Sequence, residues 1–279
     1  MPKEIIFSSP KNFDPAMVFD CGQCFRFDKT EKGSYAGVAK GKYIEVEKRD
    51  GDIFLSGASE DDRELWEDFF DMKLDYTEIG ESFSFDKTLS EAYKYSSGIR
   101  ILHQDEFETL ISFIISQNNN IPRIKGIISN LCKTYGEPVV DDGSGDVYHT
   151  FPTPEKIVEA GEEGMKNLRM GFRAGYVYDA ASKVLSGETD LNSVYAMDTE
   201  SALKYLMRIK GVGLKVASCT ALFAFRKYDA FPIDVWVKRI LDKYYDGKVE
   251  ASYFGKYGGI AQQYLFFYER CMSGVFLSK

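Results

Sequence analysis

The chain has 279 residues, 44% of them hydrophobic, a length and composition that suit one large globular domain or two moderate ones. Its first residues contain no apolar signal segment, and no run approaches the roughly 18 apolar residues of a membrane span. We therefore expect a soluble protein without a membrane partner, cytoplasmic or, in a eukaryote, nuclear.

Five scattered cysteines argue against both a disulfide framework and a metal centre. They are Cys21, Cys24, Cys132, Cys219 and Cys271. The Cys-x-x-Cys pair has no second pair beside it, and the chain has only two histidines to complete a zinc site. The four-cysteine spacing of an iron–sulfur cluster is also missing, so no metal cofactor is predicted.

The N-terminal part of the sequence has the pattern of strands. Residues 43–47 alternate between apolar and polar side chains, and Asp50 and Gly51 then form a dipeptide that is typical of a β-hairpin. We expect an antiparallel sheet here. Two short helical patterns follow, at residues 61–71 and 88–98, and are predicted to pack on the sheet.

Helical periodicity dominates the rest of the chain, where strand signals nearly vanish. Apolar patterns over residues 106–117 and 123–136 are separated near Pro122, which disfavours a helical conformation in the residue before it. No repeat or low-complexity linker divides the chain. We expect a sheet domain over residues 1–93 and a helical part over residues 94–279.

Charge is distributed unevenly along the chain, and the distribution says more about a DNA partner than the net charge of −8. Residues 51–91 contain 13 acidic and three basic side chains, a net charge of −10. Residues 201–243 contain nine basic and three acidic side chains, a net charge of +6. Such a basic run indicates either a solvated helical surface or a face that binds phosphates.

A Gly-x-Gly turn lies inside the basic segment. Gly211, Val212 and Gly213 separate two helical patterns, the second of which begins at Leu214. Glycines permit the tight backbone of a helical hairpin, and the N–H groups that start the second helix can bind a phosphate oxygen without reading a base. Many plain helix–helix turns share this pattern, so alone it does not establish DNA binding.

Lys215 and Asp234 are a candidate nucleophile and its acid–base partner. Lys215 falls in the first turn of the second helix, where the helix dipole and apolar neighbours disfavour the ammonium form and favour a nucleophilic amine. Asp234 follows Pro232 and is expected to cap the next helix. A lysine that only contacts phosphate and an aspartate that only caps a helix would explain the same residues.

These motifs together resemble the 8-oxoguanine DNA glycosylase family of the helix-hairpin-helix superfamily. The hairpin with Lys215 and the Pro-Ile-Asp sequence that ends at Asp234 resemble the lysine-containing, bifunctional branch. Four further segments resemble the family in the same order: CGQCFRF at 21–27, SQNNNIPRI at 116–124, GFRAGY at 171–176 and GIAQQYLF at 259–266. The resemblance implies an α+β fold, with a TBP-like N-terminal antiparallel sheet domain before a mostly α-helical glycosylase core, residues 94–279, that holds the active-site cleft.

The resemblance also implies a reaction and a partner. A monomer would excise 8-oxoguanine, preferably opposite cytosine, from double-stranded DNA after the damaged nucleotide leaves the helical stack. Lys215 would attack the sugar C1′, expel the base and form a Schiff base, and β-elimination would then cut the strand. Asp234 would stabilise the positive charge that develops on the sugar, and no cofactor would be needed.

Four residues match the family's pocket for the damaged base. The main-chain carbonyl of Gly22 would accept the N7 hydrogen that distinguishes 8-oxoguanine from guanine. Cys219 and Phe266 would lie on the two faces of the base, and Gln262 at its Watson–Crick edge. Without the resemblance, Cys219 and Phe266 would be interpreted as core residues.

Four others match family residues that contact the rest of the DNA. Asn118 would fill the space that the flipped base leaves, while Arg123 and Arg173 would hydrogen-bond the orphaned cytosine, for which a planar fork of donors is suited. Phe172 stands where the family commonly has a tyrosine, and would wedge into the duplex. Helix termination and core packing are the structural alternatives for these residues.

The hairpin is further expected to contact phosphate through Gly211, Val212 and Gly213. The resemblance implies a structural monovalent or calcium ion on the main-chain carbonyls of Met207, Ile209 and Val212. Two positions depart from the family: Lys210 replaces a proline, and Trp236 replaces a histidine that contacts the DNA backbone in animal members.

Two other functions remain open at this point. A helix-hairpin-helix protein that binds DNA without chemistry would use Lys215 only as a cation. A glycosylase for alkylated bases or for adenine would keep the fold and change the pocket, although the lysine argues against the first and the absent iron–sulfur cysteines against the second.

Overall fold

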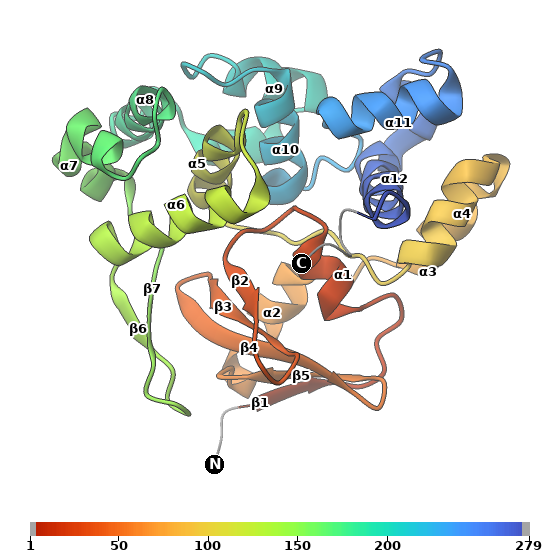
Figure 1. The fold of residues 1–279 in the computed structure, drawn as a ribbon, viewed down its shortest axis with the longest axis horizontal. Coiled ribbons are helices and arrows are strands. Elements are labelled where there is room, and N and C mark those ends of the chain that lie inside the picture. The colour runs from red at the N-terminus through yellow and green to blue at the C-terminus, as the bar shows by residue number, and fades with distance from the viewer. Residues whose placement is uncertain (1–3, 275–279) are drawn as a thin grey trace.

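The computed structural model of the protein describes residues 4–274 and places an N-terminal sheet beside a larger helical part (Figure 1). The sheet is antiparallel, with five strands in the spatial order β1-β5-β4-β3-β2. The strands are β1 (Glu4–Phe7), β2 (Phe27–Lys29), β3 (Tyr35–Ala39), β4 (Lys42–Arg49) and β5 (Asp52–Ser56). The predicted α+β fold, with its sheet at the N-terminus, is confirmed.

The β4–β5 hairpin turns where its dipeptide predicts. Asp50 and Gly51 have φ angles of 51° and 91°, the left-handed conformation that both central residues of a type I′ turn require. The resulting register buries Ile53 and Leu55, which alternate with more exposed neighbours along β5. A local signal of two residues therefore sets the register of the whole hairpin.

Helices α1 (Pro15–Asp20) and α2 (Arg63–Phe69) pack against the sheet. Trp66 and Phe69 of α2 join the inward-facing strand side chains in one core, and their rings meet edge to face with centroids 5.6 Å apart. The prediction that the helix at 61–71 packs on the sheet is confirmed.

The prediction for residues 88–98 is wrong, because the helix there does not pack on the sheet. This helix, α4 (Lys87–Ser96), packs on α12 (Gly258–Met272), and Leu89 and Ala92 belong to the core of the helical part (Figure 1). Helical periodicity indicates that one face is buried but does not say against what. The domain boundary after residue 93 stays a prediction, although side chains before it already join the helical core.

Helices dominate the rest of the chain, as predicted, although α3 (Tyr76–Ser82) was not predicted. The other helices of the helical part, besides α4 and α12, are α5 (Glu106–Ser116), α6 (Ile121–Tyr135), α7 (Pro154–Asn167), α8 (Arg173–Leu185), α9 (Thr199–Leu206), α10 (Leu214–Phe225) and α11 (Val235–Tyr245). Short 3₁₀ helices are η1 (Glu60–Asp62), η2 (Phe83–Phe85), η3 (Leu191–Ala196) and η4 (Ala251–Tyr257). Within residues 4–274, no helix combines the length and apolarity needed to cross a bilayer.

A second, two-stranded sheet interrupts the helical part and was not predicted. Strands β6 (Pro138–Val140) and β7 (Val147–His149) form an antiparallel hairpin that extends alongside the N-terminal sheet (Figure 1). Tyr148 of β7 packs on Tyr43 of β4, with ring centroids 4.5 Å apart. Strands of three residues are too short to show a clear alternation, so their signal is lost in the sequence.

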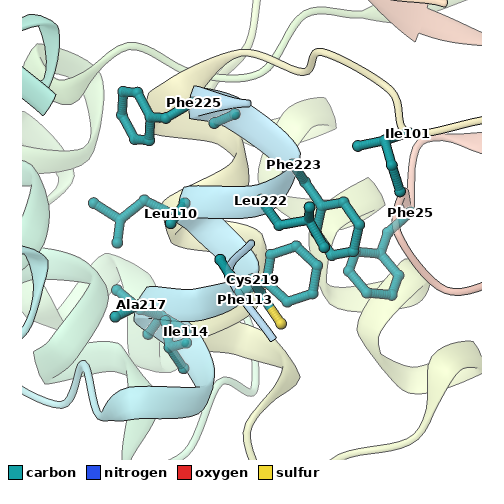
Figure 2. Packing of buried hydrophobic residues seen from close by; sticks show 14 of the residues in the cluster. Phe25, Ile101, Leu110, Phe113, Ile114, Ala217, Cys219, Leu222, Phe223 and Phe225 are labelled. Carbon is teal, nitrogen blue, oxygen red and sulfur yellow. The ribbon is translucent and has the colours of Figure 1, made fainter. Parts of the chain in front are cut away.

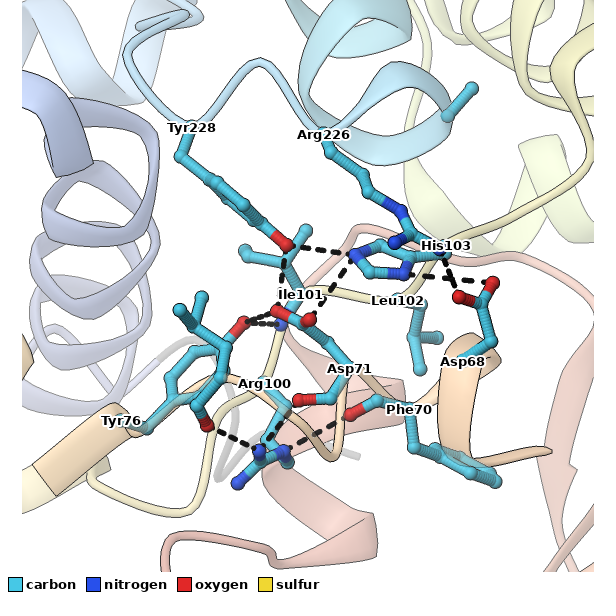
Figure 3. Close-up of polar contacts among 12 residues, drawn as sticks. Asp68, Phe70, Asp71, Tyr76, Arg100, Ile101, Leu102, His103, Arg226 and Tyr228 are labelled. Carbon is cyan, nitrogen blue, oxygen red and sulfur yellow. Dashed lines mark hydrogen bonds and ion pairs between the residues drawn. The ribbon is translucent and has the colours of Figure 1, made fainter. Parts of the chain in front are cut away.

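Arg100 joins the two parts of the molecule through main-chain carbonyls. Its side chain is 3% exposed, and its guanidinium donates to five carbonyl oxygens, of which those of Phe70 and Asp71 are seen in Figure 3. The acceptors belong to Lys11, Asn12, Phe70, Asp71 and Leu74. Because these donors are paired inside the protein, Arg100 fixes the segment before α5 to the sheet domain.

The carboxylate of Asp71 continues this buried network (Figure 3). Its Oδ2 accepts hydrogen bonds from the hydroxyls of Tyr76 and Tyr228, each at 2.8 Å, and Nε2 of His103 lies 2.9 Å from the Tyr228 hydroxyl. Burial raises the pKa of Asp71 to about 6 and lowers the pKa of His103 to about 3. Since Tyr228 lies three residues after the end of α10 at Phe225, the network anchors the C-terminal end of that helix.

Candidate active site

Helix α10 carries the candidate nucleophile and runs through the helical core. Residues 216–225 are all buried, and Figure 2 shows Phe113 and Phe223 among the apolar side chains that pack along the helix. These two rings, from α5 and α10, stack with centroids 5.4 Å apart. Gly213 is the N-cap, so Lys215 lies in the first turn of α10, as predicted. Core packing therefore fixes the backbone that carries Lys215.

The amine of Lys215 lies against the C-terminal end of α5. Its Nζ donates to Oγ of Ser116 at 3.0 Å and lies 4.9 Å from the ring centroid of Phe113. Ser116 falls inside a segment that carries the family resemblance, but nothing in the sequence assigns it a role. It is 99 positions from Lys215, and only the packing of α5 on α10 brings them together.

Lys215 and Asp234 both act electrostatically on the thiol of Cys219. Cys219 is buried one helical turn after Lys215. Burial raises the pKa of the Cys219 thiol to about 11, while Lys215 lowers this pKa through its charge and a hydrogen bond and the carboxylate of Asp234 raises it. The structure thus brings the two predicted catalytic residues and one predicted pocket residue to the same place.

Asp234 is held by the start of α11. It is the N-cap of that helix, and its Oδ1 accepts a hydrogen bond from the main-chain N–H of Val237 at 2.8 Å. The predicted cap is confirmed. One carboxylate oxygen thereby fixes the side chain at the start of the helix.

Gly22 and Phe266 also meet, from opposite ends of the chain. Gly22 has a φ of 85°, and a Cβ built on it would lie 3.6 Å from the Phe266 ring and 3.9 Å from Ile121. Glycine therefore supplies a left-handed backbone and leaves the main chain close to an aromatic face. The predicted pocket residues Gly22 and Phe266 are neighbours in the structure.

One face of α12 contributes three side chains to this region. Gln262, Phe266 and Arg270 are spaced by four residues, the spacing of one helical face. Gln262 is 3% exposed and accepts a hydrogen bond from Gln263 at 3.0 Å, and the guanidinium of Arg270 lies 5.3 Å from the centroid of Phe266. Arg270 was missed in the sequence, although its spacing from Phe266 was a usable signal.

The loop between α5 and α6 is held by Arg173. The Arg173 side chain is 3% exposed, and its Nε donates to the carbonyl of Gln117 at 2.7 Å, while Nη2 donates to the carbonyls of Gln117 and Asn118, the latter at 2.9 Å. Asn118 is exposed with a φ of 47°. The structure therefore places Arg173 and Asn118 together, with the guanidinium facing the protein main chain.

Arg123 and Phe172 flank this loop. Arg123 is exposed in the first turn of α6, and burial together with the Arg123 charge lowers the pKa of Arg173. Phe172 is 55% exposed, and the Arg173 guanidinium carbon lies 4.5 Å from its ring centroid. A large apolar ring left in water next to two arginines indicates a surface that binds a partner.

The α9–α10 hairpin packs on α8. Gly211 has a φ of 80°, and a Cβ there would lie 2.3 Å from the ring of Tyr176. The main-chain N–H of Lys210 donates to Asp179 of α8 at 3.0 Å. A Cβ on Gly213 would meet open space, so that residue faces outward. The first glycine is needed for packing, and the second leaves the helix start accessible.

The other predicted features of the hairpin are placed but not tested. The carbonyl of Ile209 accepts a hydrogen bond from Val212 at 3.1 Å, so one of the three proposed ion ligands also has a partner within the turn. The carbonyls of Met207 and Val212 stay predicted ligands. Trp236 lies in the first turn of α11, where Arg239 is 5.4 Å from its ring centroid.

The basic segment 201–243 does not form one patch. Arg226 pairs with Asp68 beside the buried network, and Lys243 pairs with Glu269 at 2.9 Å. Lys227 donates to main-chain carbonyls. The side chains that are exposed near the hairpin and the start of α11 are Arg208, Lys210, Lys238 and Arg239. The face that can meet DNA is therefore smaller than the sequence suggests.

Comparisons with known proteins agree with this arrangement. Residues 5–110 match the N-terminal domain of 8-oxoguanine DNA glycosylase, and residues 111–252 match the HhH-GPD superfamily base excision DNA repair protein. The N-glycosylase/DNA lyase OGG1 of Arabidopsis thaliana is 30% identical over 91% of this chain and 76% of its own. A probable N-glycosylase/DNA lyase of Methanothermobacter thermautotrophicus is 32% identical over 67% of this chain, a match that spans 65% of that relative.

A solved structure covers almost the whole chain. The 8-oxoguanine glycosylase/lyase of Clostridium acetobutylicum, in complex with double-stranded DNA containing cytosine opposite to 8-oxoG, is 37% identical with a TM-score of 0.93 over 98% of both chains. Both halves of the sequence, the sheet and the helical core thus match the same kind of protein. The chain belongs to the 8-oxoguanine DNA glycosylase family within the HhH-GPD superfamily of base excision DNA repair proteins.

Proposed function

We propose that the protein is a bifunctional DNA glycosylase and AP lyase that excises 8-oxoguanine, preferably opposite cytosine, from duplex DNA. One observation supports this proposal: Lys215, half-buried at the start of α10, and Asp234, at the start of α11, both act electrostatically on the buried thiol of Cys219. An amine that is held in an apolar site beside a carboxylate is suited to attack a sugar carbon.

The Lys215 nitrogen would attack C1′ with its lone pair while the C1′–N9 bond breaks and its electrons leave with the base, which gains a proton. The attached nitrogen then loses a proton, and opening of the sugar ring gives a Schiff base. Removal of a C2′ proton expels the 3′ oxygen and cuts the strand. The carboxylate of Asp234 would stabilise the positive charge on the sugar, and the chemistry requires no cofactor.

The pocket for the base would be formed by Gly22, Cys219, Gln262 and Phe266. A Cβ built on Gly22 would lie 3.6 Å from the Phe266 ring, and this proximity supports a site to which both residues contribute, with the Gly22 carbonyl at the edge of the base. Burial keeps the Cys219 thiol neutral at physiological pH, since its pKa is raised to about 11, so it presents an uncharged surface to a base face.

The surface for the duplex would extend from the hairpin to Asn118, Arg123, Phe172 and Arg173. Exposure of Phe172 at 55% supports its role as a wedge. Arg173 donates to main-chain carbonyls in this structure, so reading the orphaned cytosine requires it to exchange those acceptors for the cytosine O2 and N3.

Borohydride trapping tests the proposal. Incubation with an 8-oxoguanine:cytosine duplex and borohydride should give a covalent adduct, which Lys215→Gln abolishes while leaving a folded protein. Lys210→Gln, a charge change in the same hairpin, should weaken binding but form the adduct at saturating protein. Tight binding by the wild-type protein without any adduct would instead support a DNA-binding module.

A further inference from the structure

Ser116 lies between the reactive amine and the end of helix α5. Its hydroxyl donates to the main-chain carbonyl of Phe113 at 2.8 Å and accepts from Nζ of Lys215 at 3.0 Å. A serine hydroxyl has one hydrogen, and here that hydrogen is used on the carbonyl. Ser116 Oγ can therefore offer only its lone pairs to the Lys215 amine.

The residues before and after Ser116, whose hydroxyl accepts the hydrogen bond from Lys215, are both fixed by tertiary contacts. Phe113 is buried and stacks on Phe223 of α10, so the last turn of α5 and the helix that carries Lys215 move together. On the other side, the guanidinium of Arg173 binds the carbonyls of Gln117 and Asn118, the two residues that follow Ser116. The Ser116 hydroxyl is therefore fixed relative to the backbone of α10.

We propose that Ser116 is a positioning residue for the nucleophile. A neutral primary amine has two N–H bonds and one lone pair in a tetrahedral arrangement. When one N–H is held by Ser116 Oγ and the nitrogen lies within reach of Cys219, rotation about the Cε–Nζ bond is restricted and the lone pair has a preferred direction. Preorganised geometry of this kind lowers the barrier of an attack step.

This inference rests on the proposed function, because it assumes that Lys215 attacks a sugar. It adds a residue to that site, because Ser116 contacts the nucleophile and would act through it. Loss of its hydroxyl should slow imine formation without weakening DNA binding. A role that is only structural would instead change stability and affinity together, and would not depend on a hydroxyl.

The experiment measures single-turnover rates of borohydride-trapped adduct and DNA affinity for several variants, on an 8-oxoguanine:cytosine duplex and on an abasic-site duplex. Ser116→Ala should lower the maximal rate about tenfold or more on both duplexes, with the dissociation constant changed by less than about twofold. Ser116→Thr, which keeps a hydroxyl, should recover most of the rate. Ser112→Ala removes a buried hydroxyl one turn earlier on α5 and should trap like the wild type.

Ser116→Cys keeps a side chain of similar size but replaces the hydroxyl by a poor acceptor. Its trapping rate should therefore be low, and it tests the role of the hydroxyl even if the alanine variant is unstable. Wild-type trapping rates in both the alanine and the cysteine variant would overturn the role of Ser116 and leave the proposed function intact. Absence of any adduct with the wild-type protein and Ser112→Ala would overturn the proposed function itself.

Discussion

The two ends of helix α10 differ in how their polar groups are partnered. At the C-terminal end, Tyr228 enters a buried network with Asp71 and His103, and Arg226 pairs with Asp68 beside it (Figure 3). At the N-terminal end, Lys215 is half-buried, and apolar side chains at the starts of α10 and α11 are exposed to solvent. Leu214 there is 58% exposed and Val235, at the start of α11, is 65% exposed.

The polar groups at the first end stabilise the fold, whereas the groups at the second end are available to bind a partner. A buried polar group stabilises a fold when it has hydrogen-bond partners, and both the Arg100 guanidinium and the Asp71 carboxylate have partners inside the protein. Exposed apolar residues that flank a half-buried amine contribute little to folding and are expected to be covered by DNA. Changes at the first end should affect stability, and changes at the second should affect binding and chemistry.

The largest effect is expected from Arg100→Ala. Removing this guanidinium leaves several buried carbonyls without a donor, which should lower the free energy of unfolding by roughly 3–5 kcal/mol. Chemical denaturation measures the change. Arg208→Ala, at the exposed hairpin, should change stability by less than about 0.5 kcal/mol. Equal stabilities of the two variants would remove the distinction between the two ends.

The second largest effect is expected from Gly211→Ala. The new Cβ would lie 2.3 Å from the Tyr176 ring at a φ of 80°, so both steric overlap and backbone strain should destabilise the hairpin by about 1–3 kcal/mol. Gly213→Ala is the matched control, since its Cβ would meet open space. Thermal unfolding should show a loss only for the first variant, and DNA affinity should fall for both if the hairpin backbone approaches a phosphate. A stable Gly211→Ala protein would contradict the packing of the hairpin on α8.

His103→Gln should change the pH dependence of stability. Burial lowers the pKa of His103 to about 3 in the folded protein, whereas the unfolded chain takes up this proton near its ordinary pKa of 6.5. The contribution of neutral His103 to the free energy of unfolding is therefore fully present above about pH 6.5. It is lost as pH falls toward 3, by up to about 1.4 kcal/mol per pH unit. The variant should lose this part of the slope in denaturation curves between pH 6.5 and 4. An unchanged slope would mean that His103 is not buried in its neutral form.

The smallest effect is expected from Lys210→Gln. Loss of one exposed phosphate contact should reduce the slope of log K against log salt concentration by about 0.9, with little effect on stability. Lys204→Gln is a control, because Lys204 already pairs with Glu200 on the surface of α9. Binding titrations at salt concentrations from about 50 to about 200 mM give both slopes. Equal reductions would mean that the basic segment acts only through its total charge.

Local sequence signals predicted those parts of the structure that short-range chemistry determines. The Asp50-Gly51 turn, the cap at Asp234 and the place of Lys215 in a first helical turn each depend on a few neighbouring residues. The resemblance to a family then indicated which distant segments share a site, and the structure places Gly22 beside Phe266 accordingly.

Contacts between distant elements were not predictable in the same way. The hydrogen bond from Lys215 to Ser116 joins residues 99 positions apart, and it depends on how α5 packs on α10. The packing of α4 on α12 and the burial of Arg173 also depend on tertiary contacts, which periodicity does not encode. Sequence patterns therefore show which face is buried, while the structure shows what that face meets.

The account depends on a covalent bond between Lys215 and a deoxyribose. The most direct test is peptide mass spectrometry of the borohydride-reduced complex formed with an 8-oxoguanine:cytosine duplex. The added sugar mass is expected on the peptide that contains Lys215. Attachment to a different lysine, or recovery of unmodified protein from a complex that binds and cuts the duplex, would contradict it.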